Sequence, residues 1–147
     1  MELGIHSEAR HARLRQPLVL VCDDTESIRR LLRINLELHG YEVEESADGR
    51  ALMSRLIDPE MPIPEVILLD AQMEPYDGWW AIAAIRSHHR LNSVPVAMVT
   101  ASVQQHDRLQ AQEAGIDEFI AKPFDPDDLV AAVSRLVTGG RLPTAAH

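Results

Sequence analysis

The sequence predicts an α/β fold in which helices cover a doubly wound, five-stranded parallel sheet. Apolar runs without polar alternation recur along the chain, and such runs are typical of strands buried on both faces. Segments with apolar residues at helical spacing separate these runs, and this alternation implies parallel strands joined by right-handed crossovers. The expected strands are residues 18–22, 41–46, 66–70, 96–100 and 118–121.

The first strand and helix show this pattern clearly. Residues 18–22 read LVLVC, a run without a polar residue. Apolar side chains then recur at helical spacing, at Ile28, Leu31, Leu32 and Leu36. Gly40 follows them, and glycine suits the end of a helix because it readily adopts a left-handed backbone conformation. The first unit is therefore a strand followed by a helix.

The later units repeat this order. Asp48-Gly49 predicts a turn before the second helix, and the proline-punctuated loop 58–65 follows that helix. Asp77-Gly78 precedes the third helix, and Gly115 ends the fourth. The helices after the first are expected at about 51–56, 78–85, 104–114 and 129–137.

Length and composition favour one folded domain. The 147 residues are enough for a single core, and the shares of hydrophobic and charged residues, 46% and 25%, are ordinary for a globular protein. We expect the domain at 17–138, between an N-terminal tail at 1–16 and a C-terminal tail at 139–147.

Charge and hydropathy exclude several classes of partner and location. The net charge of -9 repels phosphate backbones and anionic lipids, so direct binding to nucleic acid or membrane is not expected. The single cysteine, Cys22, cannot form an internal disulfide and fits a buried apolar position. No apolar stretch approaches the roughly 18 residues of a spanning helix, which together with the cysteine usage predicts a cytoplasmic location.

Four expected strands end in residues that include polar side chains. These ends carry Asp23-Asp24, Asp70, Thr100-Ala101 and Lys122-Pro123. Because open parallel sheets bind ligands beyond the carboxyl ends of their strands, these residues are expected to converge there.

The chemistry of these residues indicates a metal-assisted phosphoryl site. Crowded carboxylates repel one another unless a hard divalent cation compensates their charge, so Asp23 and Asp24 are expected to hold magnesium. Lys122 and Thr100 are then placed to bind phosphoryl oxygens, the first as a point charge and the second as a hydrogen-bond donor. Asp70 remains as the nucleophile.

In these features the chain resembles the response regulator receiver domains of two-component signalling, in particular the chemotaxis-regulator-like ones. Five motifs carry the resemblance in order between residues 18 and 124: VCDD, LLDAQM, DG, VTA and FIAKPF. The resemblance implies a flavodoxin-like (βα)5 fold with strand order 2-1-3-4-5. It also implies a phosphoprotein of signal transduction or of a phosphorelay, which acts as a phosphorylation-controlled interaction switch.

The resemblance assigns a magnesium-binding role, or a manganese-binding one, to four residues. Asp24 would be a direct ligand, Asp23 a ligand through water, and Gln72 a ligand through its main-chain carbonyl. Asp70 would be both a ligand and the phosphoacceptor.

The resemblance also implies a phosphoryl pocket and a switch. Thr100, Lys122 and the amide of Ala101 would contact the phosphoryl group. Phe119 would be the aromatic residue whose rotamer follows Thr100, and the Lys122-Pro123 peptide would be cis.

Residues near Asp70 and Thr100 modify this expectation. Glu74 stands where the family usually has proline, and Pro75 follows one residue later, so the sequence does not fix the shape of that loop. Gln72 and Ser102 occupy positions that modulate phosphoryl lifetime in this family.

Histidine kinases or histidine phosphotransfer proteins are the expected donors. A downstream protein or a second copy of the chain would bind the face formed by 104–138. Two alternatives remain: a degenerate receiver that serves as a constitutive binding or dimerisation module, and an aspartate-nucleophile phosphatase. The chain is not expected to be an enzyme, since Gln72 stands where such phosphatases carry a second aspartate.

Some of these residues also suit purely structural roles. Asp24 or Thr25 would also suit the N-cap of the first helix. Trp79 and Trp80 are neighbours on a helix and point about 100° apart, so one core face cannot easily bury both. A partner surface and partial burial are about equally expected for this pair.

Overall fold

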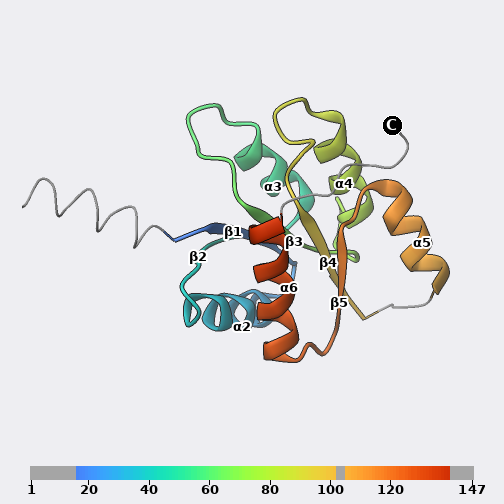
Figure 1. Cartoon of the computed structure of the whole chain (residues 1–147). Coiled ribbons are helices and arrows are strands. Elements are labelled where there is room, and N and C mark those ends of the chain that lie inside the picture. Colours follow the sequence, from blue (N-terminus) through green and yellow to red (C-terminus); the bar gives the residue numbers. More distant parts are fainter. Residues whose placement is uncertain (1–15, 102–104, 140–147) are drawn as a thin grey trace, which may run out of the picture.

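The computed structural model describes residues 16–101 and 105–139, which form a five-stranded parallel sheet with the strand order β2-β1-β3-β4-β5 (Figure 1). The strands are β1 (Leu18–Cys22), β2 (Glu42–Ser46), β3 (Val66–Asp70), β4 (Val96–Thr100) and β5 (Glu118–Ala121). The helices are α2 (Glu26–Glu37), α3 (Gly49–Leu56), α4 (Gly78–Ser87), α5 (Gln105–Ala114) and α6 (Pro126–Gly139). The predicted doubly wound fold and its strand order are confirmed. The predicted tails, apart from Gln16 and Gly139, and Ser102 lie outside the described residues.

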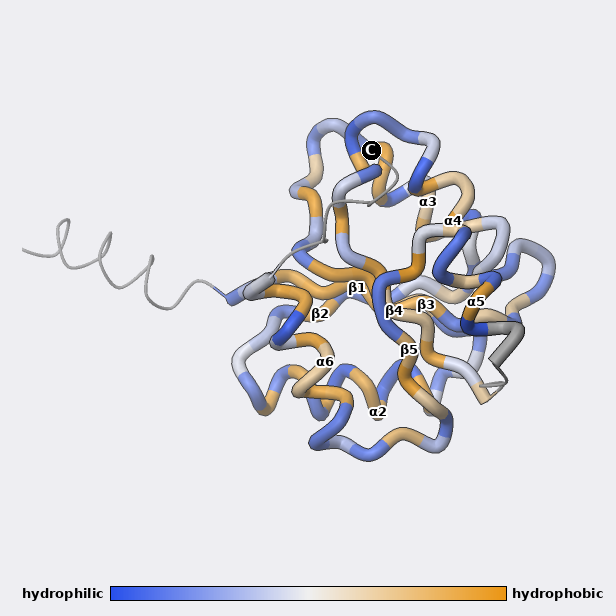
Figure 2. The backbone as a smooth tube through the Cα atoms, turned by 45° about the vertical axis from the view of Figure 1, so that its right-hand side comes forward, coloured by the Kyte–Doolittle hydropathy of each residue, from blue (hydrophilic) through white to orange (hydrophobic). Residues whose placement is uncertain are grey.

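The sheet separates two apolar layers because alternate side chains of each strand point to opposite faces. Leu18, Leu20 and Cys22 of β1 join the layer that includes α3 and α4, whereas Val19 and Val21 join the layer that includes α2 and α6. Figure 2 shows the apolar residues concentrated along the strands between these helices. Cys22 is buried, as predicted from its place in the apolar run.

Element boundaries differ from the prediction where capping groups set them. Tyr41 was expected in the second strand, but its amide donates to Leu36 O (3.1 Å) at the end of α2, so β2 begins one residue later. Gly40 has a left-handed backbone, with φ of 89°, as expected for a helix end. Asp48 proves to be the N-cap of α3, because its carboxylate accepts a hydrogen bond from Ala51 N (2.8 Å).

The other termini follow the same logic. Asp77 caps α4 by accepting from Trp80 N (2.9 Å), and the helix begins at the predicted Asp77-Gly78 pair. α6 begins three residues earlier than expected, at Pro126, a residue type that suits the first turn of a helix. None of the helices in the described ranges is long and apolar enough to cross a membrane.

Trp79 and Trp80 differ in burial, as expected for neighbouring residues that point in different directions on a helix. Trp79 is partly buried and packs against the core on the α3 and α4 side of the sheet. Trp80 is 41% exposed, and its ring lies 4.8 Å from that of Tyr76, centroid to centroid. Partial burial therefore describes Trp79, while Trp80 stays on the surface.

Candidate functional site

The structure brings the predicted polar residues together at the carboxyl ends of four strands. Asp23 directly follows β1, Asp70 is the last residue of β3, Thr100 ends β4 and Lys122 follows β5. Main-chain hydrogen bonds extend the sheet to these positions, from Asp23 N to Ser46 O (3.1 Å) and from Lys122 N to Thr100 O (2.9 Å). The parallel register therefore places all four side chains at one edge.

Three carboxylates form the acidic part of this site, which we call the acid cluster: Asp23, Asp24 and Asp70. One oxygen from each lies within 4.8 Å of the others. Asp23 and Asp70 are buried, with 1% and 5% of their surface exposed, whereas Asp24 is exposed. The cluster is thus open to solvent on the side of Asp24.

Asp23 is held tightly by its neighbours. Its Oδ1 accepts a hydrogen bond from Thr25 N (2.9 Å), and its Oδ2 accepts one from Lys122 Nζ (2.7 Å). Asp24 is held more loosely, with a long hydrogen bond of 3.4 Å from Thr25 Oγ1. Thr25 occupies the N-cap position of α2, but its side chain does not cap the helix. Helix capping therefore does not account for the acids at this position.

Asp70 lies in an environment that opposes its ionisation. Burial, followed by the negative charge of Asp23, raises the pKa of the Asp70 carboxyl above its usual range. Hydrogen bonding from Gln72 N (3.2 Å) and the charge of Lys122, 3.4 Å away, partly offset this effect. Asp70 would ionise more easily if a further cation joined the site.

Lys122 joins the two buried acids and is the one lysine in the sequence. Burial opposes its charge, but its hydrogen bond to Asp23 and the charges of Asp23 and Asp70 outweigh burial, so the pKa of Lys122 is raised. Its ammonium group therefore stays protonated at neutral pH. The Lys122-Pro123 peptide is cis, as predicted.

Thr100 and Ala101 complete the edge on the β4 side. Thr100 is 2% exposed, and the following Ala101 lies at the surface. Phe119, the predicted switch residue, lies on β5 beside Met98 of β4, and its ring packs against the core on the α3 and α4 side. The guanidinium of Arg108 lies 5.5 Å from the centroid of that ring.

The loop between β3 and α4 is closed by contacts that sequence analysis did not identify. The Glu74-Pro75 peptide in this loop is cis. Gly78 N donates to Ala71 O (3.2 Å), and a Cβ at Gly78 would collide with the main-chain carbonyl of Asp70. The Asp77-Gly78 pair was read as a helix start, although its glycine also permits this close approach.

The donor set suits a hard divalent cation. Carboxylate oxygens are the ligands that Mg²⁺ and Mn²⁺ prefer, and here three carboxylates face one another with Lys122 as the cation that contacts two of them. Burial and the neighbouring charge of Asp23 raise the pKa of Asp70, and a bound cation would oppose both effects. The residues present therefore fit the predicted metal.

The chain is similar in sequence to curated transcriptional regulators. The chain is 34% identical over 131 residues to the DNA-binding dual master transcriptional regulator RpaA of Synechocystis, covering 88% of this chain and 53% of that protein. It is 35% identical over 119 residues to the transcriptional regulatory protein ResD of Bacillus subtilis, covering 81% of this chain and 47% of that one. The chain thus spans about half the length of these curated relatives.

Solved structures show the same fold. The chemotaxis response regulator CheY4 of Vibrio cholerae aligns with a TM-score of 0.76 and 28% identity, covering 82% of this chain and 98% of that one. The receiver domain of the Francisella response regulator 1452 aligns with a TM-score of 0.76 and 26% identity, covering 84% and 98%. The family model of the response regulator receiver domain matches residues 19–134. The chain therefore belongs to the response regulator receiver domains of two-component signal transduction.

Proposed function

We propose that this receiver domain accepts a phosphoryl group on Asp70 from a phosphohistidine and uses it to control a protein interaction. The observation that carries the proposal is the arrangement of Asp70 beside the other acids and Lys122. A buried carboxylate, a lysine ammonium 3.4 Å away and two further acids within 4.8 Å combine a nucleophile with the charges that phosphoryl transfer needs.

The proposed transfer is a displacement at phosphorus. A carboxylate oxygen of Asp70 attacks, the bond between phosphorus and the imidazole nitrogen breaks, and its electron pair stays with the histidine of the donor. The product is an aspartyl phosphate on this chain and an unphosphorylated histidine on a histidine kinase or phosphotransfer protein. The chain thereby supports its own modification.

Residues around Asp70 have distinct parts in this proposal. Lys122 already lies near both buried acids and supplies a fixed positive charge to the transferred group. The hydroxyl of Thr100 and the amide of Ala101 donate hydrogen bonds to phosphoryl oxygens.

Asp23, Asp24, Asp70 and the main-chain carbonyl of Gln72 would hold Mg²⁺ or Mn²⁺, with Asp23 acting through water. When bound, the cation supplies positive charge that stabilises the phosphoryl oxygens. The chain's own contribution is to hold the three carboxylates close together at one edge of the sheet.

The output is proposed to use the face formed by 104–138. The phosphoryl group would draw Thr100 inward, and Phe119 would change its rotamer in response, altering a surface made by α5, β5 and α6. The occupant would be a downstream protein or a second copy of the chain. We expect no direct nucleic-acid contact from this chain, whose net charge is -9, although one relative is named as DNA-binding. A cytoplasmic location is part of the same proposal.

Phosphorylation by acetyl phosphate tests this function. The full chain is incubated with Mg²⁺ and acetyl phosphate, and intact masses are compared for wild type and Asp70→Asn. One added phosphoryl group on wild type alone is the expected result. No addition despite measurable Mg²⁺ binding would contradict the proposal and favour a constitutive binding module. Continuous release of phosphate with rapid turnover would instead favour a phosphatase.

A further inference from the structure

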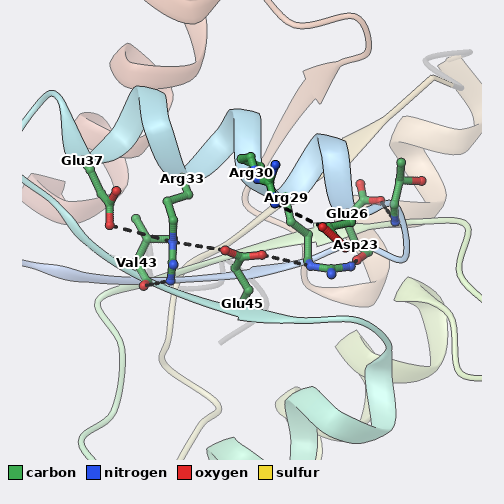
Figure 3. Close-up of polar contacts among 9 residues, drawn as sticks. Asp23, Glu26, Arg29, Arg30, Arg33, Glu37, Val43 and Glu45 are labelled. Atoms are coloured by element: carbon green, nitrogen blue, oxygen red, sulfur yellow. Dashed lines mark hydrogen bonds and ion pairs between the residues drawn. The ribbon is translucent and has the colours of Figure 1, made fainter.

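Arg29 follows the first three residues of α2, and its side chain reaches back to Asp23 (Figure 3). Its main-chain amide bonds Thr25 O (3.0 Å), which places it one turn beyond the helix start. Side chains of a helix lean toward its N-terminus, so the guanidinium of Arg29 can reach the β1–α2 turn. There Arg29 Nη1 donates a hydrogen bond of 2.7 Å to the main-chain carbonyl of Asp23.

This carbonyl belongs to the peptide plane that joins Asp23 to Asp24. Asp23 is fixed on every other side, by Ser46 O at its amide and by Thr25 and Lys122 at its carboxylate. Asp24 is exposed and has a long hydrogen bond of 3.4 Å from Thr25 Oγ1. The orientation of the plane from which Asp24 projects therefore depends on the hydrogen bond from Arg29.

An ion-pair network anchors Arg29 in this position. Arg29 Nε lies 3.1 Å from Glu45 Oε1, and the other oxygen of Glu45 lies 3.1 Å from Arg33 Nε. Arg33 also donates to Val43 O (2.6 Å). Glu45 and Val43 belong to β2, which pairs with β1. Only 16% of the Arg29 side chain is exposed. Its guanidinium lies between Glu45 on the edge strand β2 and Asp23 of the acid cluster.

We propose that Arg29 is a positioning residue for the divalent cation, acting by fixing the Asp23–Asp24 peptide so that the exposed Asp24 carboxylate is held in place to bind metal. This inference rests on the proposed metal site. Groups that orient metal ligands without touching the metal typically change metal affinity by about 10-fold to 100-fold when removed.

The charge of Arg29 makes the sign of the effect informative. A guanidinium beside the acid cluster repels an incoming cation, so by charge alone its removal would strengthen metal binding. A positioning role predicts the opposite, because loss of the hydrogen bond frees the peptide plane and disperses the orientations of Asp24. The direction of the change separates the two roles.

The test uses Arg29→Met with Arg33→Met as its matched control. Both variants remove one arginine from α2 and one ion pair to Glu45. Arg29 also binds the Asp23 carbonyl, whereas Arg33 binds Val43 and Glu37 instead. Binding of Mn²⁺ to the full chain is measured from the free-ion signal in electron paramagnetic resonance, and thermal unfolding is followed in parallel. Arg29→Met should bind Mn²⁺ about tenfold more weakly. Arg33→Met should stay within a factor of about two, as for an ordinary surface ion pair.

The other outcomes are distinguishable. If wild type binds Mn²⁺ and Arg29→Met binds it equally or more tightly, the positioning role is wrong and the metal site stands. If wild type binds no Mn²⁺, both proposals fail.

Arg29→Lys provides a second test in case Arg29→Met does not fold. Lysine keeps the charge but cannot bridge Asp23 and Glu45 with one rigid fork, so it should weaken binding to a smaller extent. Wild-type affinity in Arg29→Lys would contradict the proposal.

Discussion

The ends of β1 and β3 present carboxylates to the same site, but the chain secures them by different means. At the end of β1, Asp23 is held by hydrogen bonds from side chains, with Lys122 on its carboxylate and Arg29 on its carbonyl. At the end of β3, the turn after Asp70 is closed by backbone packing, because Gly78 approaches the Asp70 carbonyl more closely than any Cβ would allow.

Substitutions at the two strand ends should therefore affect different properties. Polar contacts at the end of β1 set where charges lie, and their loss should alter the chemistry of the site more than the stability of the fold. Close packing at the end of β3 leaves no room for adjustment, so a change there should lower the stability of the whole domain.

The largest effect is expected at Lys122, which contacts both strand ends. Lys122→Met removes the fixed positive charge, and losing one preorganised group of this kind typically slows the chemical step by about 10²-fold to 10³-fold. The rate of phosphorylation by acetyl phosphate at saturating Mg²⁺ measures the effect. Arg135→Met is the control, since Arg135 pairs with Glu118 at the surface, away from the site. A Lys122→Met rate within a few-fold of wild type would show that the lysine is dispensable.

A smaller effect, on stability, is expected at Gly78. Gly78→Ala places a Cβ against the main chain of Asp70 and Ala71, and overpacking of this kind typically lowers the free energy of unfolding by about 1–3 kcal/mol. Urea denaturation measures the change. Gly139→Ala is the matched control, because a Cβ there meets nothing within 4 Å and alanine favours a helix. Equal stability in the two variants would mean that the turn after β3 adjusts.

The smallest effect is expected in the pH dependence of stability. Because its pKa is raised in the folded chain, Asp70 disfavours folding at neutral pH, and this penalty disappears as pH falls below the pKa of an unfolded aspartate. Without metal, Asp70→Asn should therefore be more stable than wild type at pH 7, and the difference should shrink on acidification.

Chemical denaturation at several pH values, with and without Mg²⁺, follows this change. Saturating Mg²⁺ should reduce the advantage of Asp70→Asn, because the cation favours the ionised acid. A variant less stable than wild type at pH 7 without metal would show that Lys122 outweighs burial and Asp23 at this carboxylate.

Much of the fold could be predicted because it depends on local patterns. The LVLVC and VILLD runs marked strands buried on both faces, and helical spacing marked α2 and α6. Element ends were predicted less well where a side chain or amide outside the periodic pattern sets them. Asp48 caps α3 before the first apolar residue of that helix, and Tyr41 closes α2 instead of opening β2.

The acids, Thr100 and Lys122 were predictable because parallel strands deliver their carboxyl ends to one edge. Their supports were not, because these depend on which neighbours lie close in space. Arg29, Arg30 and Arg33 look alike in the sequence, yet Arg29 reaches Asp23 while Arg30 pairs with Glu26 at the surface. Similarly, Gly78 read as part of a helix start, and its contact with Asp70 requires knowledge of the folded loop.

Lys122 has a practical consequence as the one lysine among 147 residues. Selective ¹⁵N labelling of lysine would give a single side-chain resonance, and that resonance would come from the centre of the site without any mutation. Conversely, amine-directed coupling to a sensor surface or a dye could attach only to this ammonium group or to the chain's terminal amine. Attachment through cysteine would target Cys22, which is buried. Labels for binding studies on this domain are therefore best placed through an introduced surface cysteine far from the strand ends.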